Sequence, residues 1–274
     1  MTNKDQGFFI PHRYHQTALE KAPKMSYLPT YFAQSEARFL KWLKKIEQYE
    51  QPFKRFDHAA PPSPRWQQDW FTGLDGAIAY ILVCELKPRR IIEIGSGHST
   101  RFMMQAIFEC QNNTQLFTID PKPRADLRKF AKQKALTWFD THIQNLDLSL
   151  LPRLEKGDFL FVDSSHILMP GSDVDVIFSQ IMPSLSHGVY VHFHDIFMPE
   201  PYPCQWQWRA YNEQNALALW LSQHRLNGRS ATIEWASHYV RHHLLTRDQS
   251  QIKLPQPIAK CAQNVFETSL WLTI

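Results

Sequence analysis

Short apolar runs alternate with amphipathic segments from about residue 90 to the end of the chain. Between the first two runs, apolar side chains recur at helical spacing from Phe102 to Cys110. Runs of about five apolar residues separated by helices are typical of a parallel sheet covered on both faces. The pattern predicts an α/β protein with a doubly wound, mostly parallel seven-stranded sheet. The predicted strands cover residues 91–94, 116–119, 138–143, 158–162 and 189–193, followed by β-like segments at 231–235 and 269–274.

The N-terminal part of the chain has a helical pattern instead. A proline-rich stretch at 59–64 interrupts helical structure, so we predict a helical N-terminal extension, residues 1–63, and a main domain, residues 64–274. Residues 66–86 predict a further helix, which Pro88 ends. We hypothesise that the extension either covers the functional site or joins two subunits as a homodimer. Its apolar stripe consists of Phe32, Phe39, Leu43, Ile46 and Tyr49.

Composition narrows the class of protein. The chain has 274 residues, 43% hydrophobic and 20% charged, with 9 glycines and a formal net charge of +4, which excludes collagen-like and disordered chains. The basic helix faces have no interleaved aromatic residues and no nucleic-acid motif, so we expect no nucleic-acid partner. The first residues lack the apolar core of a signal peptide, and no stretch approaches the ~18 apolar residues of a membrane span. We therefore expect a cytoplasmic protein with no membrane partner, and four widely spaced cysteines in reduced form.

Polar residues gather where the predicted strands end. In a doubly wound sheet, ligands bind outside the carboxyl ends of the strands, near the point where the strand order reverses. We therefore expect the functional site at this edge of the sheet. The candidates are residues 93–99, Asp120, Gln144, Asn145, residues 163–166, His194 and Asp195.

A glycine-containing turn follows the first strand and opens a helix. In the segment 93–100, EIGSGHST, two glycines allow a tight turn close to a ligand, and the helix N-terminus offers free amide donors. Asp120, about 25 residues after Gly95, ends the next strand, where a carboxylate can bind both hydroxyls of a ribose. Thr100 stands where a dinucleotide fold prefers a third glycine, and the lysine of a P-loop is absent. These features predict a nucleoside-bearing ligand without a required pyrophosphate, which describes S-adenosylmethionine.

Several segments resemble a known family. IIEIGSGHST resembles the first motif of class I S-adenosylmethionine-dependent methyltransferases, and FTIDPKP resembles their second. GDFLFVDSSH, SDVD and HGVYVHFHDIF, followed by YP and YNEQ, resemble the bacterial methyltransferase domain 24 group. Its members are mostly small-molecule O-methyltransferases or proteins assigned by that analogy. The resemblance extends from about Pro64 to the closing SLWL segment and implies a Rossmann-like fold.

The resemblance implies roles for the residues of these motifs. Gly95 and Gly97 would pass the methionine part of the cofactor, with Glu93 near its amino group, and Asp120 would hold the ribose. Asp163 would lie beside the methionine end of the cofactor and face the acceptor. The other residues assigned to cofactor binding are Ser96, Ser99 and Thr100 in the turn, and Gln144 and Asn145 beside the adenine.

Two neighbouring strand ends should bring carboxylates and imidazoles together. The residues are Asp163, His166, His194 and Asp195, and two kinds of chemistry suit them. His166 or His194 could act as a general base towards an acceptor hydroxyl. Alternatively, Asp163, His194 and Asp195 could bind Mg²⁺ or another divalent metal that lowers the pKa of the hydroxyl. Metal-dependent catechol-type methyltransferases follow their second acidic residue with Asn, whereas this chain has the pair His-Asp, so both alternatives stay open.

Two further features have structural and functional interpretations. His192 lies deep in its apolar run and is predicted to be a core histidine. The aromatic residues Tyr202, Trp206, Trp208 and Tyr211 follow the His-Asp pair directly. They either pack under a long loop or form a lid and wall for the acceptor.

These observations predict a methyltransferase that transfers a methyl group from S-adenosylmethionine to an oxygen of a small polar molecule. Two other classes remain as alternatives. An NAD(P)-dependent oxidoreductase would use the same turn and Asp120, although Thr100 argues against it. A non-catalytic nucleoside-binding protein would have the fold without a use for the carboxylate and imidazole cluster.

Overall fold

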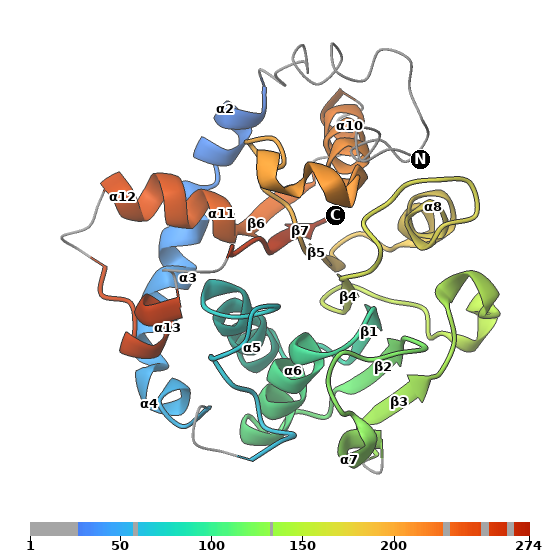
Figure 1. Ribbon diagram of the computed structural model, residues 1–274, viewed down its shortest axis with the longest axis horizontal. Coiled ribbons are helices and arrows are strands. Elements are labelled where there is room, and N and C mark those ends of the chain that lie inside the picture. Colours follow the sequence, from blue (N-terminus) through green and yellow to red (C-terminus); the bar gives the residue numbers. More distant parts are fainter. Residues whose placement is uncertain (1–26, 57–59, 132–133, 227–230, 248–251, 262–265) are drawn as a thin grey trace.

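The computed structural model describes residues 27–56, 60–131, 134–226, 231–247, 252–261 and 266–274. Within them, seven strands form one sheet in the order β3-β2-β1-β4-β5-β7-β6 (Figure 1). Strands β1 to β5 run parallel, whereas β7 is antiparallel to both β5 and β6. The predicted α/β class with a mostly parallel seven-stranded sheet is confirmed. The strands are β1 (Arg90–Ile94), β2 (Gln115–Ile119), β3 (Leu136–Phe139), β4 (Phe159–Val162), β5 (Tyr190–Phe193), β6 (Thr232–Ala236) and β7 (Leu270–Thr273).

The parallel strands end in register, so the residues that follow them lie side by side at one edge of the sheet. Every residue of β4 is buried, as expected for a strand covered on both faces. Ile94 pairs with Ile119 on one side and with Val162 on the other, and Val162 pairs with Phe193. The residues that follow β1, β2, β4 and β5 therefore lie along one edge.

Helices surround this sheet. α5 (Leu74–Leu86) and α6 (His98–Glu109) pack against each other, and α3 (Glu36–Gln48) packs against β6 and α5. α8 continues through a π-helical turn, Ile177–Ile181, into α9. The main helices are α5 (Leu74–Leu86), α6 (His98–Glu109), α7 (Arg128–Ala131), α8 (Asp173–Val176), α9 (Met182–Ser184), α10 (Glu213–Leu226), α11 (Ser237–Tyr239), α12 (Leu245–Arg247) and α13 (Gln256–Cys261).

The helices of the predicted N-terminal extension share the core of the main domain. They are α2 (Leu28–Ala33), α3 (Glu36–Gln48) and α4 (Glu50–Phe53), on the flank of the molecule beside α11 to α13 (Figure 1). Phe32 and Phe39 are fully buried, and both rings lie within 6 Å of the ring of Tyr239. Residues 1–26 of the predicted extension lie outside the described residues.

Two predicted elements have other bounds in the structure. The helix predicted over residues 66–86 begins only at Leu74, because Gly73 has a φ of +58° and the preceding backbone is turned by Gln68, whose side-chain oxygen accepts two backbone N–H bonds. The third strand ends at Phe139, so Gln144 and Asn145 lie in a 3₁₀ turn, Ile143–Asn145, beyond the strand.

The prediction that all four cysteines are reduced is wrong for two of them. Cys84 in α5 and Cys110 directly after α6 form a disulfide, while Cys204 and Cys261 stay thiols. The packing of α5 on α6 brings the two Cα atoms to 5.5 Å, a spacing that sequence separation does not reveal. Disulfides persist mainly in oxidising compartments. The cytoplasmic location stays a prediction.

We expect the double variant Cys84→Ala, Cys110→Ala to lose about 3 kcal/mol of unfolding free energy, because the bond closes a loop of 26 residues. Denaturant unfolding measures this loss. Thiol titration of the unreduced, unfolded protein should find Cys204 and Cys261 reactive. Four reactive thiols would contradict the bond.

No helix among the described residues is long and apolar enough to cross a membrane.

Candidate active site

The turn after β1 is built around Gly95 and Asp120. Gly95 has a φ of +81°, and a Cβ there would lie 1.8 Å from the carbonyl oxygen of Asp163, so no other residue fits. The backbone N–H and hydroxyl of Ser96 donate to Asp120 Oδ2 at 2.7 and 3.1 Å, and the N–H of Lys122 donates to Oδ1 at 2.7 Å. The carboxylate of Asp120 therefore joins the ends of β1 and β2.

A first pocket of about 290 Å³ opens beside this turn. Among the residues predicted to bind cofactor, Gly95, Ser96, Asp120, Gln144 and Asp163 line it. Apolar side chains, Ile94, Ile119 and Ile143, form part of its wall. Asn145 does not line this pocket.

The remaining residues of the predicted turn lie beneath it. Ser99 and Thr100 donate to the two oxygens of the fully buried Glu93 at 2.7 and 2.8 Å, and the N–H of Gly97 donates to the Thr100 hydroxyl at 3.0 Å. The structure thus places these residues as support for the turn rather than in the pocket wall. Burial raises the pKa of Glu93 to about 8, against the hydrogen bonds from Ser99 and Thr100.

We expect the protein to lose stability as the pH rises from the ordinary 4.5 of a glutamate towards about 8. The raised pKa means that the folded state holds the Glu93 proton more tightly than the unfolded chain, so a rise in pH favours unfolding. Glu93→Gln should flatten this dependence, because an amide does not titrate. Denaturant unfolding of both proteins at low and neutral pH measures how the free energy of unfolding changes with pH. An equal change in wild type and Glu93→Gln would contradict the raised pKa of Glu93.

His166 lies in a cage of carboxylates. Its Nδ1 is 2.8 Å from Oε2 of Glu213, at the start of α10, and its Nε2 is 3.3 Å from Asp195 Oδ2 and 3.5 Å from Asp163 Oδ1. The His166 side chain is 3% exposed, and its backbone has a φ of +62°. Both ring nitrogens therefore face negatively charged groups.

His194 has a similar environment. Its Nε2 is 3.2 Å from Asp75 Oδ2 in α5, and its Nδ1 is 3.4 Å from both Asp163 Oδ1 and Asp195 Oδ1. Asp75 also accepts the backbone N–H groups of residues 268 and 269, each at 2.9 Å. Asp163 and Asp195 thus each contact both imidazoles, and the four predicted residues are brought together as expected.

This geometry makes the two histidines proton donors. Burial by itself lowers their pKa values, but Asp195 acts most strongly on His166 and Asp163 on His194, and the pKa of each imidazole is raised well above its usual value. Burial opposes the ionisation of Asp163, yet His194 and His166 lower its pKa well below the usual value. The contacts within the cluster therefore favour the imidazolium form of both histidines and the ionised form of Asp163.

The arrangement of the cluster gives no support to the predicted metal set. Among the described residues, no three His, Cys, Asp or Glu side chains are arranged to hold one. A metal ligand needs a free imidazole nitrogen. Nδ1 of His194 faces the carboxylates of the two other predicted ligands, Asp163 and Asp195, and the metal alternative stays a prediction.

Asp75 and Glu213 were not among the predicted site residues. Asp75 is an acid in the first turn of a mostly apolar helix, and Glu213 is the acid of the YNEQ segment. Both signals are visible in the sequence. Their partners are not, because His194 is 119 residues from Asp75, and His166 is 47 residues from Glu213.

A second pocket of about 310 Å³ adjoins the first. The two share Asp163 and Arg124, and the second also includes His194 and Asp195 in its wall. The Arg124 guanidinium lies 4.1 Å from the ring centre of Trp70, which also lines the second pocket. Asp163 therefore stands on the common wall of two pockets.

The aromatic residues after β5 divide between the two predicted roles. Trp206 lines the second pocket together with Arg209, whose guanidinium lies 4.3 Å from its ring centre. The Tyr211 ring packs 4.7 Å from the ring of His166, and Trp208 is 64% exposed. Trp206 thus forms part of the wall of the second pocket, and Tyr211 packs against the charged cluster.

His192 is a core residue, as predicted. It is fully buried, its Nε2 lies 2.9 Å from the Ser269 hydroxyl, and its ring stacks on Phe161 at 3.7 Å. Burial, followed by the nearby His194, lowers its pKa well below the usual value. It lines neither of the two pockets.

Comparison with known proteins gives one family match. Residues 92–196 match a family model described as a methyltransferase domain, of the methyltransferase domain 24 group. No curated protein matches the chain.

Solved structures match at low identity. The SAH-bound methyltransferase PaMTH1 of Podospora anserina is 16% identical, over 84% of this chain and 86% of that one, with a TM-score of 0.45. TomG, an O-methyltransferase of Streptomyces achromogenes in complex with SAM, is 20% identical over 70% and 80%, with a TM-score of 0.38. The plantazolicin methyltransferase BpumL, in complex with SAH, is 13% identical over 96% and 99%, with a TM-score of 0.42.

The family match spans β1 to β5, the strands that end at the first pocket and the charged cluster. The predicted resemblance to the methyltransferase domain 24 group is confirmed over residues 92–196.

Proposed function

We propose that the protein transfers a methyl group from S-adenosylmethionine to a hydroxyl oxygen of a small polar molecule. The main support is the pair of adjoining pockets that share Asp163. A cofactor in the first pocket and an acceptor in the second would meet beside this carboxylate.

The first pocket suits a nucleoside. Its wall combines the carboxylate of Asp120 with apolar side chains, and a carboxylate has enough lone pairs to accept ribose hydroxyls in addition to its bonds from Ser96 and Lys122. Gly95 leaves the backbone open to close approach. When bound, S-adenosylmethionine supplies a methyl group activated by a sulfonium cation, and Asp163 is an anion beside it.

The second pocket suits activation of a hydroxyl group. Asp195, 13% exposed, lines it and is the group that we assign as proton acceptor, because the raised pKa values of the two histidines disfavour the neutral imidazole that a base requires. His166 and His194 hold Asp195 and Asp163 in place as ion pairs. The base is therefore a carboxylate, and the imidazoles position it.

Calorimetry with S-adenosylhomocysteine and with NAD tests the proposal. We expect S-adenosylhomocysteine to bind and NAD not to bind. Tight NAD binding without S-adenosylhomocysteine binding would favour the oxidoreductase. Binding of S-adenosylhomocysteine without turnover on any hydroxylated acceptor would favour the non-catalytic protein.

We expect methyl transfer to survive removal of divalent metal. Since both nitrogens of each imidazole face carboxylates, dialysis against EDTA should change turnover by no more than about twofold. Initial rates of methyl transfer with and without added Mg²⁺ measure the dependence on metal. A loss in EDTA that Mg²⁺ restores would support the metal-assisted alternative.

Other properties remain predictions. We propose a small-molecule acceptor, no nucleic-acid or membrane partner, and a cytoplasmic location. The apolar stripe of residues 32–49 packs into the core of this chain, so a homodimer stays a prediction that this stripe does not support.

A further inference from the structure

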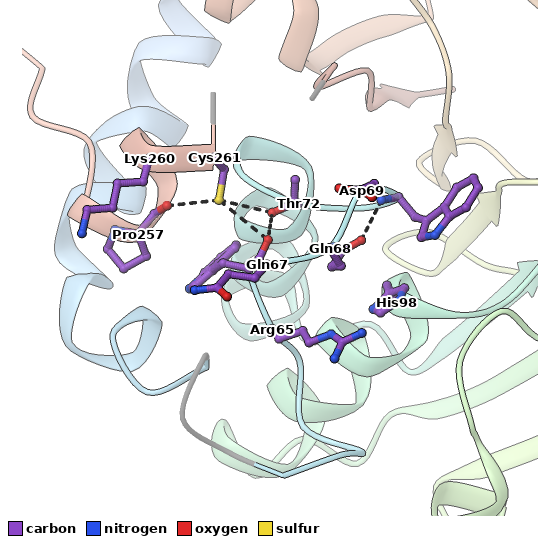
Figure 2. Close-up of a pocket in the computed structure, with 11 residues that line it drawn as sticks. Arg65, Gln67, Gln68, Asp69, Thr72, His98, Pro257, Lys260 and Cys261 are labelled. Carbon is purple, nitrogen blue, oxygen red and sulfur yellow. Dashed lines mark hydrogen bonds between the residues drawn. The ribbon is translucent and has the colours of Figure 1, made fainter. Parts of the chain in front are cut away.

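A third pocket of about 580 Å³ lies beside the second. The two share Asp69 and Trp70, whereas the third pocket shares no residue with the first. Figure 2 shows the guanidinium of Arg65 and the ring of His98 on one side of the third pocket and Lys260 and Cys261 on the other. The third pocket therefore extends from the acceptor side of the site.

The third pocket has an excess of positive charge. Arg65 and Lys260 are exposed on its wall, and among the described residues neither forms an ion pair within 4 Å, while Asp69 is the one carboxylate that lines it. Arg101 and Arg124 also act on His98. Burial, followed by the charges of Arg101, Arg65 and Arg124, lowers the pKa of His98 to about 4, so the imidazole is neutral near pH 7.

Two buried polar atoms in this region have no hydrogen-bond partner among the described residues. They are Nδ1 of His98, whose residue is 8% exposed and lines the third pocket, and Nε of Arg101, whose residue is 5% exposed. A buried polar atom without a partner costs about 1–3 kcal/mol, so such atoms call for an explanation. In the tautomer that carries its proton on Nδ1, the neutral His98 ring can donate a hydrogen bond to a polar ligand in this pocket.

We propose that the third pocket binds an oxyanion, a carboxylate or phosphate group, carried by the methyl acceptor. Arg65 and Lys260 supply the charge, and His98, the first residue of α6, supplies a buried hydrogen-bonding atom beside the positive end of the helix dipole. This proposal rests on the proposed function, because it assigns the acceptor to the second pocket. It defines the acceptor as a hydroxylated molecule with an acidic group.

Binding of inorganic phosphate and of acetate to the protein saturated with S-adenosylhomocysteine tests the pocket itself. Nuclear magnetic resonance titration at constant ionic strength would compare wild type with Arg65→Gln and Lys260→Gln. Each variant should weaken phosphate binding about tenfold, the value of one charge-assisted contact. Acetate distinguishes a carboxylate site from a phosphate site.

The matched control is the pair Lys41→Gln and Lys44→Gln, on the exposed face of α3. These variants remove the same charge from a distant basic patch, so phosphate binding should stay unchanged. Equal weakening in both pairs would show a general charge effect and would overturn the proposal. Competition between phosphate and S-adenosylhomocysteine would assign the pocket to the cofactor and also overturn it.

Methyl transfer to paired acceptors tests the substrate class. A hydroxylated aromatic acid and its phosphate analogue should be better substrates than the neutral methyl ester, and Arg65→Gln should raise KM for the acids about tenfold with little change in kcat. Equal KM values for acid and ester would contradict the proposal. If S-adenosylhomocysteine does not bind at all, the proposed function fails, while phosphate binding still reports on the third pocket.

Discussion

Asp195→Asn is expected to lower the turnover of methyl transfer by at least about 100-fold, the usual contribution of a positioned base. An amide cannot accept the acceptor proton, yet it has the shape of the carboxylate. Asparagine also tolerates the left-handed backbone of this residue, which has a φ of +56°, so the fold should persist. Single-turnover kinetics with saturating S-adenosylmethionine measures the chemical step.

Binding of S-adenosylhomocysteine separates this effect from a structural one. Asp195 lines the second pocket and not the first, so the affinity of Asp195→Asn for S-adenosylhomocysteine should equal that of wild type. Asp147→Asn, a substitution of the same kind at an exposed turn, is the control and should have normal turnover. Full turnover in Asp195→Asn would show that another group takes the proton.

Asp120→Ala is expected to weaken binding of S-adenosylhomocysteine about 100-fold, the value of two hydrogen bonds to a charged group. The substitution removes the carboxylate proposed to hold the ribose and leaves the N–H groups of Ser96 and Lys122 without their acceptor. Isothermal titration calorimetry measures the affinity.

Asp147→Ala should bind S-adenosylhomocysteine as wild type does, because Asp147 lies outside the first pocket. Thermal unfolding of Asp120→Ala in the absence of ligand would reveal any general loss of stability from the altered turn. If both variants bind equally well, the first pocket does not hold the nucleoside through Asp120.

The histidines illustrate where residue type alone was insufficient. The sequence predicted His166 or His194 as a base, because imidazole ordinarily titrates near neutral pH. In the structure their pKa values are raised by carboxylates on both sides, including Asp75 and Glu213 from distant helices. The same four strand-end residues therefore support a different division of roles, with carboxylate as base.

The glycine turn shows a similar division. The positions of Gly95 and Asp120 at adjacent strand ends follow from local pattern, and the structure joins them through Ser96. Glu93, Ser99 and Thr100 belong to the same segment, yet they lie below the turn, because Glu93 is the penultimate residue of a strand whose side chains are buried. The sequence does not reveal which residues of this segment line the pocket and which lie buried beneath it.

The sequence by itself determined the order of strands and helices and the edge of the sheet where polar residues gather, because apolar periodicity and strand ends are local properties. Only the tertiary structure decided which charges meet. Asp75, Glu213, the Cys84–Cys110 bond and the unpartnered nitrogen of His98 all depend on helix packing between residues far apart in the chain. Protonation and ligand chemistry depend on distances and burial, which exist only once the chain has folded.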